Sequence, residues 1–200
     1  MLLNNLENIV IKSVMFKEFL RNPRITGAVL PSSGKLSSVI TAEVGIKTAR
    51  HIVELGPGTG AITRHILRQM SPEAKFIAVE LNPQICEEFS RRFSGVRIIN
   101  DNAANLRAIL AREGMFEADI VISGLPWASF GAELQNQLLG EIIHSLGPRG
   151  VFTTFAYIQG LALPTAHAFK RNLEKRFSTV NRTPVIWRNI PPAVVYRCRK

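Results

Sequence analysis

The segment "VELGPGTGA" (Val53–Ala61) most constrains the fold of this chain, because three glycines and a proline directly follow a short apolar run. Glycine adopts backbone conformations that other residues avoid. A strand that passes through a glycine turn into a helix brings main-chain N–H groups close to a small molecule. The segment therefore predicts a ligand-binding turn, although many different cofactors are bound by turns of this kind.

Short apolar runs alternate with segments of helical periodicity after residue 50, which is typical of buried parallel strands joined by crossover helices. The apolar runs predicted as strands are 51–55, 76–79, 96–99, 120–122 and 151–155. The periodic segments include 62–70, 83–93 and 134–146. Residues 178–187 and 194–199 flank the Pro-rich turn "RNIPPA" and predict an antiparallel pair. We expect a doubly wound, Rossmann-like α/β sheet of about seven strands, mostly parallel with an antiparallel C-terminal strand, plus an N-terminal helical segment.

Size and composition indicate a single globular domain over residues 1–200. Within it we expect residues 1–45 to form an N-terminal helical lid or membrane-contact segment and residues 46–200 to form the ligand-binding core. No apolar run approaches the roughly 18 residues of a membrane span, and the N-terminus lacks a signal-peptide pattern. The two cysteines have no metal-ligand spacing, so we expect a cytoplasmic protein that uses no metal.

Three acidic residues stand at or near the ends of successive predicted strands. Glu54 lies two residues before the first glycine, Glu80 closes the strand in "FIAVELN", and Asp101 follows the third strand in "RIINDNAANL". A carboxylate at the second strand end accepts hydrogen bonds from both hydroxyls of a ribose. One at the third strand end is placed to accept from an exocyclic adenine amino group while the next amide donates to the ring. The set predicts a nucleoside cofactor.

Together the glycine turn and these acids resemble the class I methyltransferases that use S-adenosylmethionine, whose first motif reads E/D-x-G-x-G-x-G. The resemblance implies a sheet of six parallel strands with a seventh inserted antiparallel. It implies that the glycine turn lies under the methionine part of the cofactor, Glu80 at the ribose and Asp101 at the adenine. The cofactor-binding residues expected on this basis are Glu54, Gly56, Pro57, Gly58, Gly60, Glu80, Leu81, Asp101, Asn102, Ala103, Ser123 and Gly124.

The segment "ISGLPW" follows the fourth predicted strand, whose exit faces the departing methyl group in this class. It is similar to the N-L-P-Y motif of amine and adenine methyltransferases, but Gly124 stands where that motif has Asn. Because Gly124 has no side chain to accept a hydrogen bond from an adenine amino group, the segment disfavours adenine methylation. We expect Leu125, Pro126 and Trp127 at the acceptor, with the Trp127 ring over a methylated ammonium. The alternative is that Trp127 packs over the core or the cofactor.

Both ends of the chain resemble bacterial phosphatidylethanolamine N-methyltransferases. The similar segments are "FLRNPRITGAVLPSS" near the start, "FTTFAYIQG" at the fifth strand and "VIWRNIPPAVVYRCR" at the end. This resemblance implies methylation of a lipid headgroup amine, with Tyr157 at the exit of the fifth strand as a catalytic candidate that orients the amine. The enzyme is then expected to be peripherally associated with the inner membrane.

The charge distribution agrees with a polyanionic partner. The net charge of the chain is +10. Residues 1–50 contain seven basic and three acidic residues, and residues 164–200 contain nine basic residues and one acidic residue. A polyanion here means an anionic membrane surface or nucleic acid. We expect Lys12, Lys17, Arg21 and Arg24, on an amphipathic N-terminal helix, to contact anionic lipid headgroups. RNA or protein methylation, and a non-catalytic cofactor-binding or membrane-adaptor protein, remain alternatives.

Overall fold

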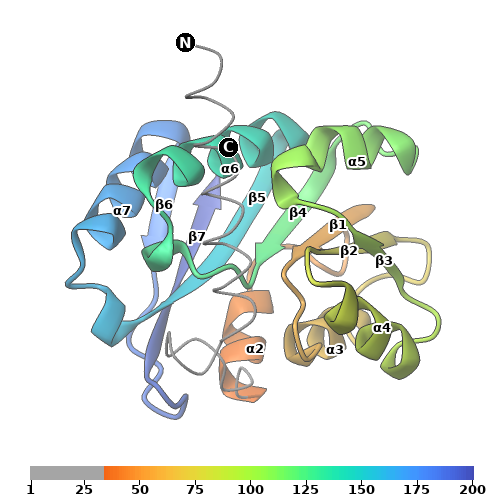
Figure 1. The fold of residues 1–200 in the computed structure, drawn as a ribbon, viewed down its shortest axis with the longest axis horizontal. Coiled ribbons are helices and arrows are strands. Elements are labelled where there is room, and N and C mark those ends of the chain that lie inside the picture. The colour runs from red at the N-terminus through yellow and green to blue at the C-terminus, as the bar shows by residue number, and fades with distance from the viewer. Residues whose placement is uncertain (1–33) are drawn as a thin grey trace. The chain divides into compact units, whose positions relative to one another are not determined.

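The computed structural model describes residues 34–200, and its centre is a seven-stranded mixed sheet (Figure 1). The strand order is β3-β2-β1-β4-β5-β7-β6. The strands are β1 (His51–Leu55), β2 (Lys75–Glu80), β3 (Arg97–Asn100), β4 (Ala118–Ser123), β5 (Leu146–Tyr157), β6 (Thr179–Arg182) and β7 (Ala193–Arg199). The first five pair in parallel, and β7 lies antiparallel between β5 and β6. This is the Rossmann-like methyltransferase topology, and the predicted fold class is confirmed.

Helices cover both faces of the sheet, as crossover connections between parallel strands require. Figure 1 shows α5, α6 and α7 on one side and α2, α3 and α4 on the other. The helices are α2 (Gly34–Thr41), α3 (Ala61–Leu67), α4 (Pro83–Arg92), α5 (Leu106–Arg112), α6 (Ala132–Ser145) and α7 (Pro164–Arg176). Short 3₁₀ turns lie at Ala103–Asn105, Trp127–Ser129 and Ile158–Gly160.

The first strands form because most of their residues are apolar and are covered on both faces. Four of the five residues of β1 and five of the six of β2 are buried. Helix α4 begins where Pro83 sets a helical φ and the Asn82 side chain accepts hydrogen bonds from the N–H groups of Gln84 and Ile85. The break from strand to helix is thus encoded locally, directly after Glu80.

Helix α2 is part of the same hydrophobic core as the sheet. Its Leu36 and Ile40 side chains are fully buried in the cluster that includes residues of β1, β4 and β7. The backbone carbonyl of Ile40 accepts a hydrogen bond from Thr153 of β5. This helix falls within the segment 1–45 that we expected to be a helical lid or membrane-contact segment, and its buried residues contribute to the hydrophobic core of the sheet. The expected roles of the remaining N-terminal residues, including Lys12, Lys17, Arg21 and Arg24, lie outside the described residues.

Candidate functional site

The carboxyl ends of β3, β2, β1 and β4 meet along one edge of the sheet and bring the predicted cofactor residues together. Three backbone hydrogen bonds join the segments that leave these strands: Gly56 N–H to Val79 O (2.9 Å), Asp101 N–H to Glu80 O (3.1 Å) and Gly124 N–H to Leu55 O (2.8 Å). In doubly wound sheets, ligands bind at this edge. The topology therefore places the glycine turn, the three acids and the loop after β4 around one space.

The turn after β1 requires glycine for two different reasons. Gly56, Gly58 and Gly60 all have φ between +52° and +75°, a region that L side chains rarely adopt. At Gly60 a Cβ atom would also lie 2.1 Å from the Phe93 ring, whereas at Gly58 it would meet no atom of residues 34–200 within 4 Å. Gly60 is therefore fixed by packing, and the space beside Gly58 is open to a ligand. Pro57 completes the turn by accepting a hydrogen bond from the Gly60 N–H.

Glu54 is a fully buried carboxylate with one oxygen left unpaired. Thr63 Oγ1, in the first turn of α3, donates to Glu54 Oε2 at 2.6 Å. No residue within 34–200 donates to Glu54 Oε1. Burial, with a smaller contribution from the charge of Glu80, raises the pKa of Glu54 to about 7. A buried acceptor without a donor is costly, so this atom fits a cofactor that brings an N–H donor or a positive charge.

Glu80 ends β2 beside the glycine turn. Its Oε1 atom accepts a hydrogen bond of 3.0 Å from the Asn82 N–H. Burial raises the pKa of Glu80, and backbone hydrogen bonds from Asn82, Leu81 and Gly58 oppose that shift. The Leu81 carbonyl accepts from the Asn100 side chain. The carboxylate is therefore held in place at the sheet edge, in the position where a ribose-binding acid was predicted.

Asp101 lies at the same edge, but its carboxylate already has partners. Oδ1 accepts from the Asn102 N–H (2.7 Å) and from Asn105 Nδ2 (2.8 Å), and Oδ2 accepts from Arg112 at 2.5 Å. Although partial burial acts in the opposite direction, these hydrogen bonds hold the pKa of Asp101 below its usual value. Asn102 caps the 3₁₀ turn that begins at Ala103. Each carboxylate oxygen has two lone pairs, so Oδ2 retains the capacity to accept one further hydrogen bond.

The loop after β4 passes close to the glycine turn. A Cβ atom on Gly124 would lie 2.5 Å from the Gly56 carbonyl oxygen, which is closer than any real Cβ contact. Ser123 is fully buried and its Oγ accepts from the Leu125 N–H and from the Trp127 indole N–H. The absence of a side chain at 124 is thus a requirement of the backbone path. The next residues, Leu125 and Pro126, follow at the edge where the acceptor was expected.

Trp127 does not face an acceptor site. Its side chain is only 1% exposed and its ring stacks on Phe169 at 4.6 Å, with Phe130 and Phe152 packed against it edge-on. The indole N–H is used by Ser123 Oγ. This position differs from the expectation that the ring covers a methylated ammonium, because the 3₁₀ turn Trp127–Ser129 directs the ring between the sheet and α7. The weighed alternative, packing over the core, describes the position of Trp127.

Tyr157 is the last residue of β5 and is half-buried at the same edge of the sheet. Its ring packs edge-on against Phe155 at 5.3 Å. Burial raises the pKa of the Tyr157 phenol above its usual value, so the hydroxyl keeps its proton at neutral pH. The group can donate a hydrogen bond or accept one, but it is not a base under these conditions.

Two findings concern what else residues 34–200 contain. No helix in this part of the chain is long and apolar enough to cross a membrane. No group of three or more His, Cys, Asp and Glu side chains within it could hold a metal ion.

Sequence reasoning missed Thr63 and Arg112, which position Glu54 and Asp101. Only Thr63 offered a signal in the sequence, because it lies in the first helical turn after the glycines.

The fold and the edge residues define a class I methyltransferase. Residues 52–150 match the family described as "Methyltransferase domain". The chain is also 31% identical to the ornithine lipid N-methyltransferase of Singulisphaera acidiphila over 91% of this chain and 92% of that protein. The chain therefore belongs to the S-adenosylmethionine-dependent methyltransferases, and it is an enzyme that binds S-adenosylmethionine.

More distant relatives have the same core. The chain is 34% identical to the ribosomal RNA small subunit methyltransferase A of Acidobacterium capsulatum, over 52% of this chain and only 36% of that protein. The crystal structure of the O-methyltransferase TomG from Streptomyces achromogenes, in complex with S-adenosylmethionine, superposes with a TM-score of 0.62 at 18% identity. That superposition covers 84% of this chain and 79% of TomG, and it supports the fold alone.

Proposed function

We propose that this enzyme transfers a methyl group from S-adenosylmethionine to the headgroup amine of a membrane lipid. The observation that carries the proposal is the similarity to an ornithine lipid N-methyltransferase over nine-tenths of both chains. The lipid is ornithine lipid or, as the sequence suggested, phosphatidylethanolamine or its methylated derivatives. Ornithine lipid and phosphatidylethanolamine present a primary amine, and the partly methylated derivatives present a secondary or tertiary one, so an amine lone pair is the acceptor in each case.

Cofactor binding is assigned to the residues at the carboxyl ends of the strands. S-adenosylmethionine supplies an electrophilic methyl group on a sulfonium sulfur, next to an ammonium, a ribose diol and an adenine. In our proposal the open side of Gly58 receives the methionine part, and the unpaired Oε1 of Glu54 accepts from a cationic donor there. Glu80 accepts from the ribose hydroxyls, and Oδ2 of Asp101 accepts from the adenine. The Asn102 N–H, which was expected to donate to the adenine ring, instead donates to Asp101 Oδ1.

The transfer itself needs proximity and alignment more than acid or base assistance. The headgroup ammonium would first lose a proton to water, and its lone pair would then take the methyl group that S-adenosylmethionine supplies, with the C–S electrons left on sulfur. The product ammonium then loses one N–H proton to water. Leu125 and Pro126 border the acceptor, and Tyr157 orients the amine through its protonated hydroxyl.

An RNA substrate is the second candidate, because the chain resembles rRNA methyltransferases and carries a net charge of +10. Two features of the site disfavour it. The Gly56 carbonyl occupies the space where a polar side chain at 124 would hold an adenine amino group, and the Trp127 ring is buried in the core. The chain also corresponds to about a third of the bacterial rRNA enzyme.

The test compares methyl transfer to different acceptors. Purified protein is incubated with methyl-labelled S-adenosylmethionine and with vesicles that contain ornithine lipid, vesicles that contain phosphatidylethanolamine, or total RNA. We expect label in the lipid fraction and none in RNA. Label that appears in RNA alone would overturn the proposal, and labelling of only one lipid would identify the headgroup.

A further inference from the structure

The loop of residues 183–192, which joins β6 to β7, has a fixed framework and an apolar surface. Ile186 N–H donates to Ala193 O at 2.7 Å and Thr183 N–H donates to Val195 O at 2.9 Å, so the base of the loop continues the sheet. Asn189 is buried, and its side chain donates to the Pro191 carbonyl at 2.6 Å. The conformation of the loop is therefore set by its own hydrogen bonds.

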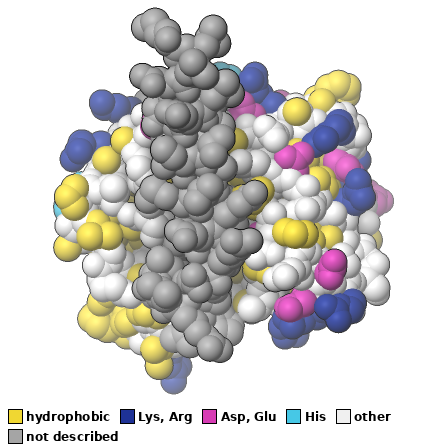
Figure 2. Space-filling model, viewed as in Figure 1, with side chains coloured by type: hydrophobic (Ala, Val, Ile, Leu, Met, Phe, Trp, Pro, Cys, Tyr) yellow, Lys and Arg dark blue, Asp and Glu magenta, His cyan; other side chains and the backbone are white. Residues whose placement is uncertain are grey.

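Two large apolar side chains extend from this framework into solvent. Trp187 is 70% exposed and Ile190 is 74% exposed, on either side of Arg188. They are two of only five large hydrophobic residues that are exposed within 34–200. Figure 2 shows hydrophobic side chains gathered at the lower left of the molecule, where Figure 1 draws the turn that leads into β7. A tryptophan and an isoleucine exposed on one hydrogen-bonded loop form a candidate surface for an apolar partner.

The loop lies at the edge of the sheet where the methyl group is transferred. Ala193 pairs with Tyr157 at the carboxyl end of β5, and the Ile158 N–H donates to the Pro192 carbonyl at 3.0 Å. The exposed apolar residues therefore belong to the same end of the molecule as the cofactor turn. A surface that binds this loop would therefore lie next to the carboxyl ends of the strands, where the proposed cofactor residues are.

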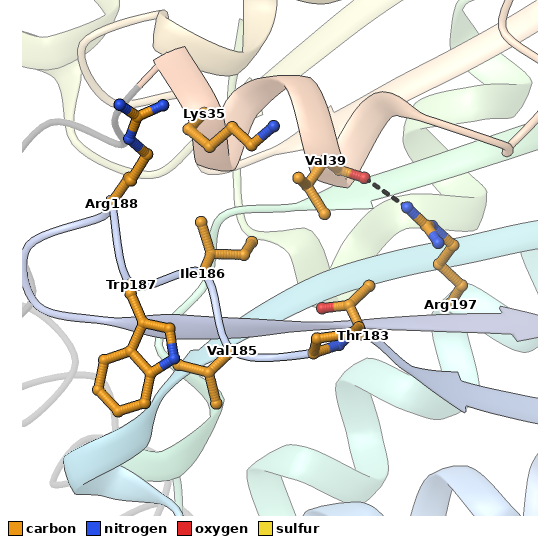
Figure 3. A pocket seen from close by; sticks show the side chains of 9 residues that line it. Lys35, Val39, Thr183, Val185, Ile186, Trp187, Arg188 and Arg197 are labelled. Carbon is orange, nitrogen blue, oxygen red and sulfur yellow. Dashed lines mark hydrogen bonds between the residues drawn. The ribbon is translucent and has the colours of Figure 1, made fainter.

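A basic pocket of about 480 Å³ lies between this loop and α2. Its lining includes Lys35, Arg188 and Arg197, the apolar residues Val39, Val185 and Ile186, and no acidic residue. Figure 3 shows Lys35 and Arg188 at one end of the pocket and Arg197, which donates to the Val39 carbonyl, at the other. Trp187 also lines the pocket, and 70% of its surface is exposed to solvent. The combination of an exposed aromatic ring and neighbouring cations is the chemistry of a membrane interface.

We propose that the 183–192 loop and the adjoining pocket dock the enzyme onto a bilayer that contains anionic lipids. Trp187 and Ile190 enter the interfacial region, while Lys35 and Arg188 contact lipid phosphates. This surface deepens the proposed function, on which it rests, because docking here turns the catalytic edge toward the lipid headgroups. It is distinct from the basic residues predicted at the N-terminus.

The experiment measures vesicle binding without any methyl transfer. The full chain is sedimented with vesicles of phosphatidylcholine alone and of phosphatidylcholine mixed with phosphatidylglycerol. Removing both apolar side chains in Trp187→Ala/Ile190→Ala is expected to weaken binding to the mixed vesicles by about tenfold or more. Lys35→Gln/Arg188→Gln should weaken it by about fivefold per charge removed, and only at low salt. Phe116→Ala is the matched control. Phe116 is 98% exposed, but it lies just before the amino end of β4, at the end of the strands opposite to the loop.

Tryptophan fluorescence locates the contact. The chain has two tryptophans, and Trp127 is already buried. Emission from Trp187 should shift to shorter wavelength when mixed vesicles are added, and Trp187→Phe should abolish the shift. The inference is overturned if the Trp187→Ala/Ile190→Ala protein binds vesicles as the wild type does, if Phe116→Ala weakens binding equally, or if the wild type binds no vesicles. If the loop binds vesicles but the enzyme methylates no lipid, the docking surface is supported and the proposed substrate is refuted.

Discussion

Thr63 Oγ1 donates a 2.6 Å hydrogen bond to Glu54 Oε2, while no donor within residues 34–200 reaches Glu54 Oε1. The threonine stabilises the charged form of the carboxylate, but burial outweighs it and raises the pKa of Glu54 to about 7. The protonation state of Glu54 therefore changes with pH near neutrality.

Glu54 should make the stability of the cofactor-free protein fall as pH rises. The ordinary pKa of about 4.5 applies to the unfolded chain and about 7 to the folded one, so the folded state holds the extra proton between these values. This contribution is complete below the lower value and is lost as pH passes through 7. Denaturant unfolding of wild type and Glu54→Gln between about pH 5 and 8 measures it. A constant difference between the two proteins would contradict the raised pKa.

Gly58→Ala should lose cofactor binding without losing the fold. The new methyl group enters the open space that we assign to the methionine part, so we expect affinity to fall by about 1–3 kcal/mol, or roughly five- to 150-fold. Gly114→Ala is the control, because Gly114 has φ +66° and the same open surroundings but lies after α5. Both variants carry a backbone strain of about 1–2 kcal/mol. Calorimetry that finds equal S-adenosylmethionine affinity in the two variants would remove the cofactor from this position.

Trp127→Ala should reduce stability and should not change acceptor preference. Truncation of a large buried aromatic side chain costs about 3–5 kcal/mol of unfolding free energy. Since the ring is enclosed by Phe130, Phe152 and Phe169, transfer to a primary amine and to a methylated amine should fall by the same factor. Kinetics with both acceptors on the milder Trp127→Phe variant provide the check. A selective loss for the methylated acceptor would restore the cation–π role.

Tyr157→Phe should lower kcat and leave S-adenosylmethionine affinity unchanged. Loss of one hydrogen bond to the amine corresponds to about 0.5–1.5 kcal/mol, or roughly two- to 13-fold in rate. The pH profile should keep its shape, because the raised pKa of Tyr157 keeps the phenol protonated across neutral pH. Tyr196→Phe, on the buried part of β7, is the matched control and should have no effect on kcat. A profile that loses a basic limb in Tyr157→Phe would make the tyrosine a proton acceptor.

The central strands β1, β2 and β4 were predictable because they are buried on both faces and therefore appear as apolar runs. The run His51–Leu55 matches β1 to the residue, and the Pro-rich turn marks the antiparallel entry of β7. The run 178–187 was predicted as one strand, but β6 ends at Arg182 and the rest forms the loop that exposes Trp187. Apolar composition alone does not distinguish a buried strand residue from a residue on an exposed apolar loop.

The site was predictable where the backbone dictates the residue type and not where distant contacts do. Positive φ accounts for the glycines after β1, and strand ends account for Glu54 and Glu80. Gly124, by contrast, was interpreted as a missing acceptor, while the structure shows a contact with the Gly56 carbonyl that only the folded sheet creates. The direction of the Trp127 ring likewise depends on α7, some forty residues later in the chain.

The central claim is methyl transfer to a lipid amine, and product analysis tests it most directly. Mass spectrometry of lipids after incubation with S-adenosylmethionine and vesicles containing ornithine lipid or phosphatidylethanolamine shows whether a headgroup fragment has gained a methyl group. We predict methylation on the headgroup nitrogen, strongly reduced in Gly58→Ala at limiting S-adenosylmethionine and retained in Gly114→Ala. Unchanged headgroups in the presence of bound S-adenosylmethionine, with methylation of RNA instead, would contradict the account.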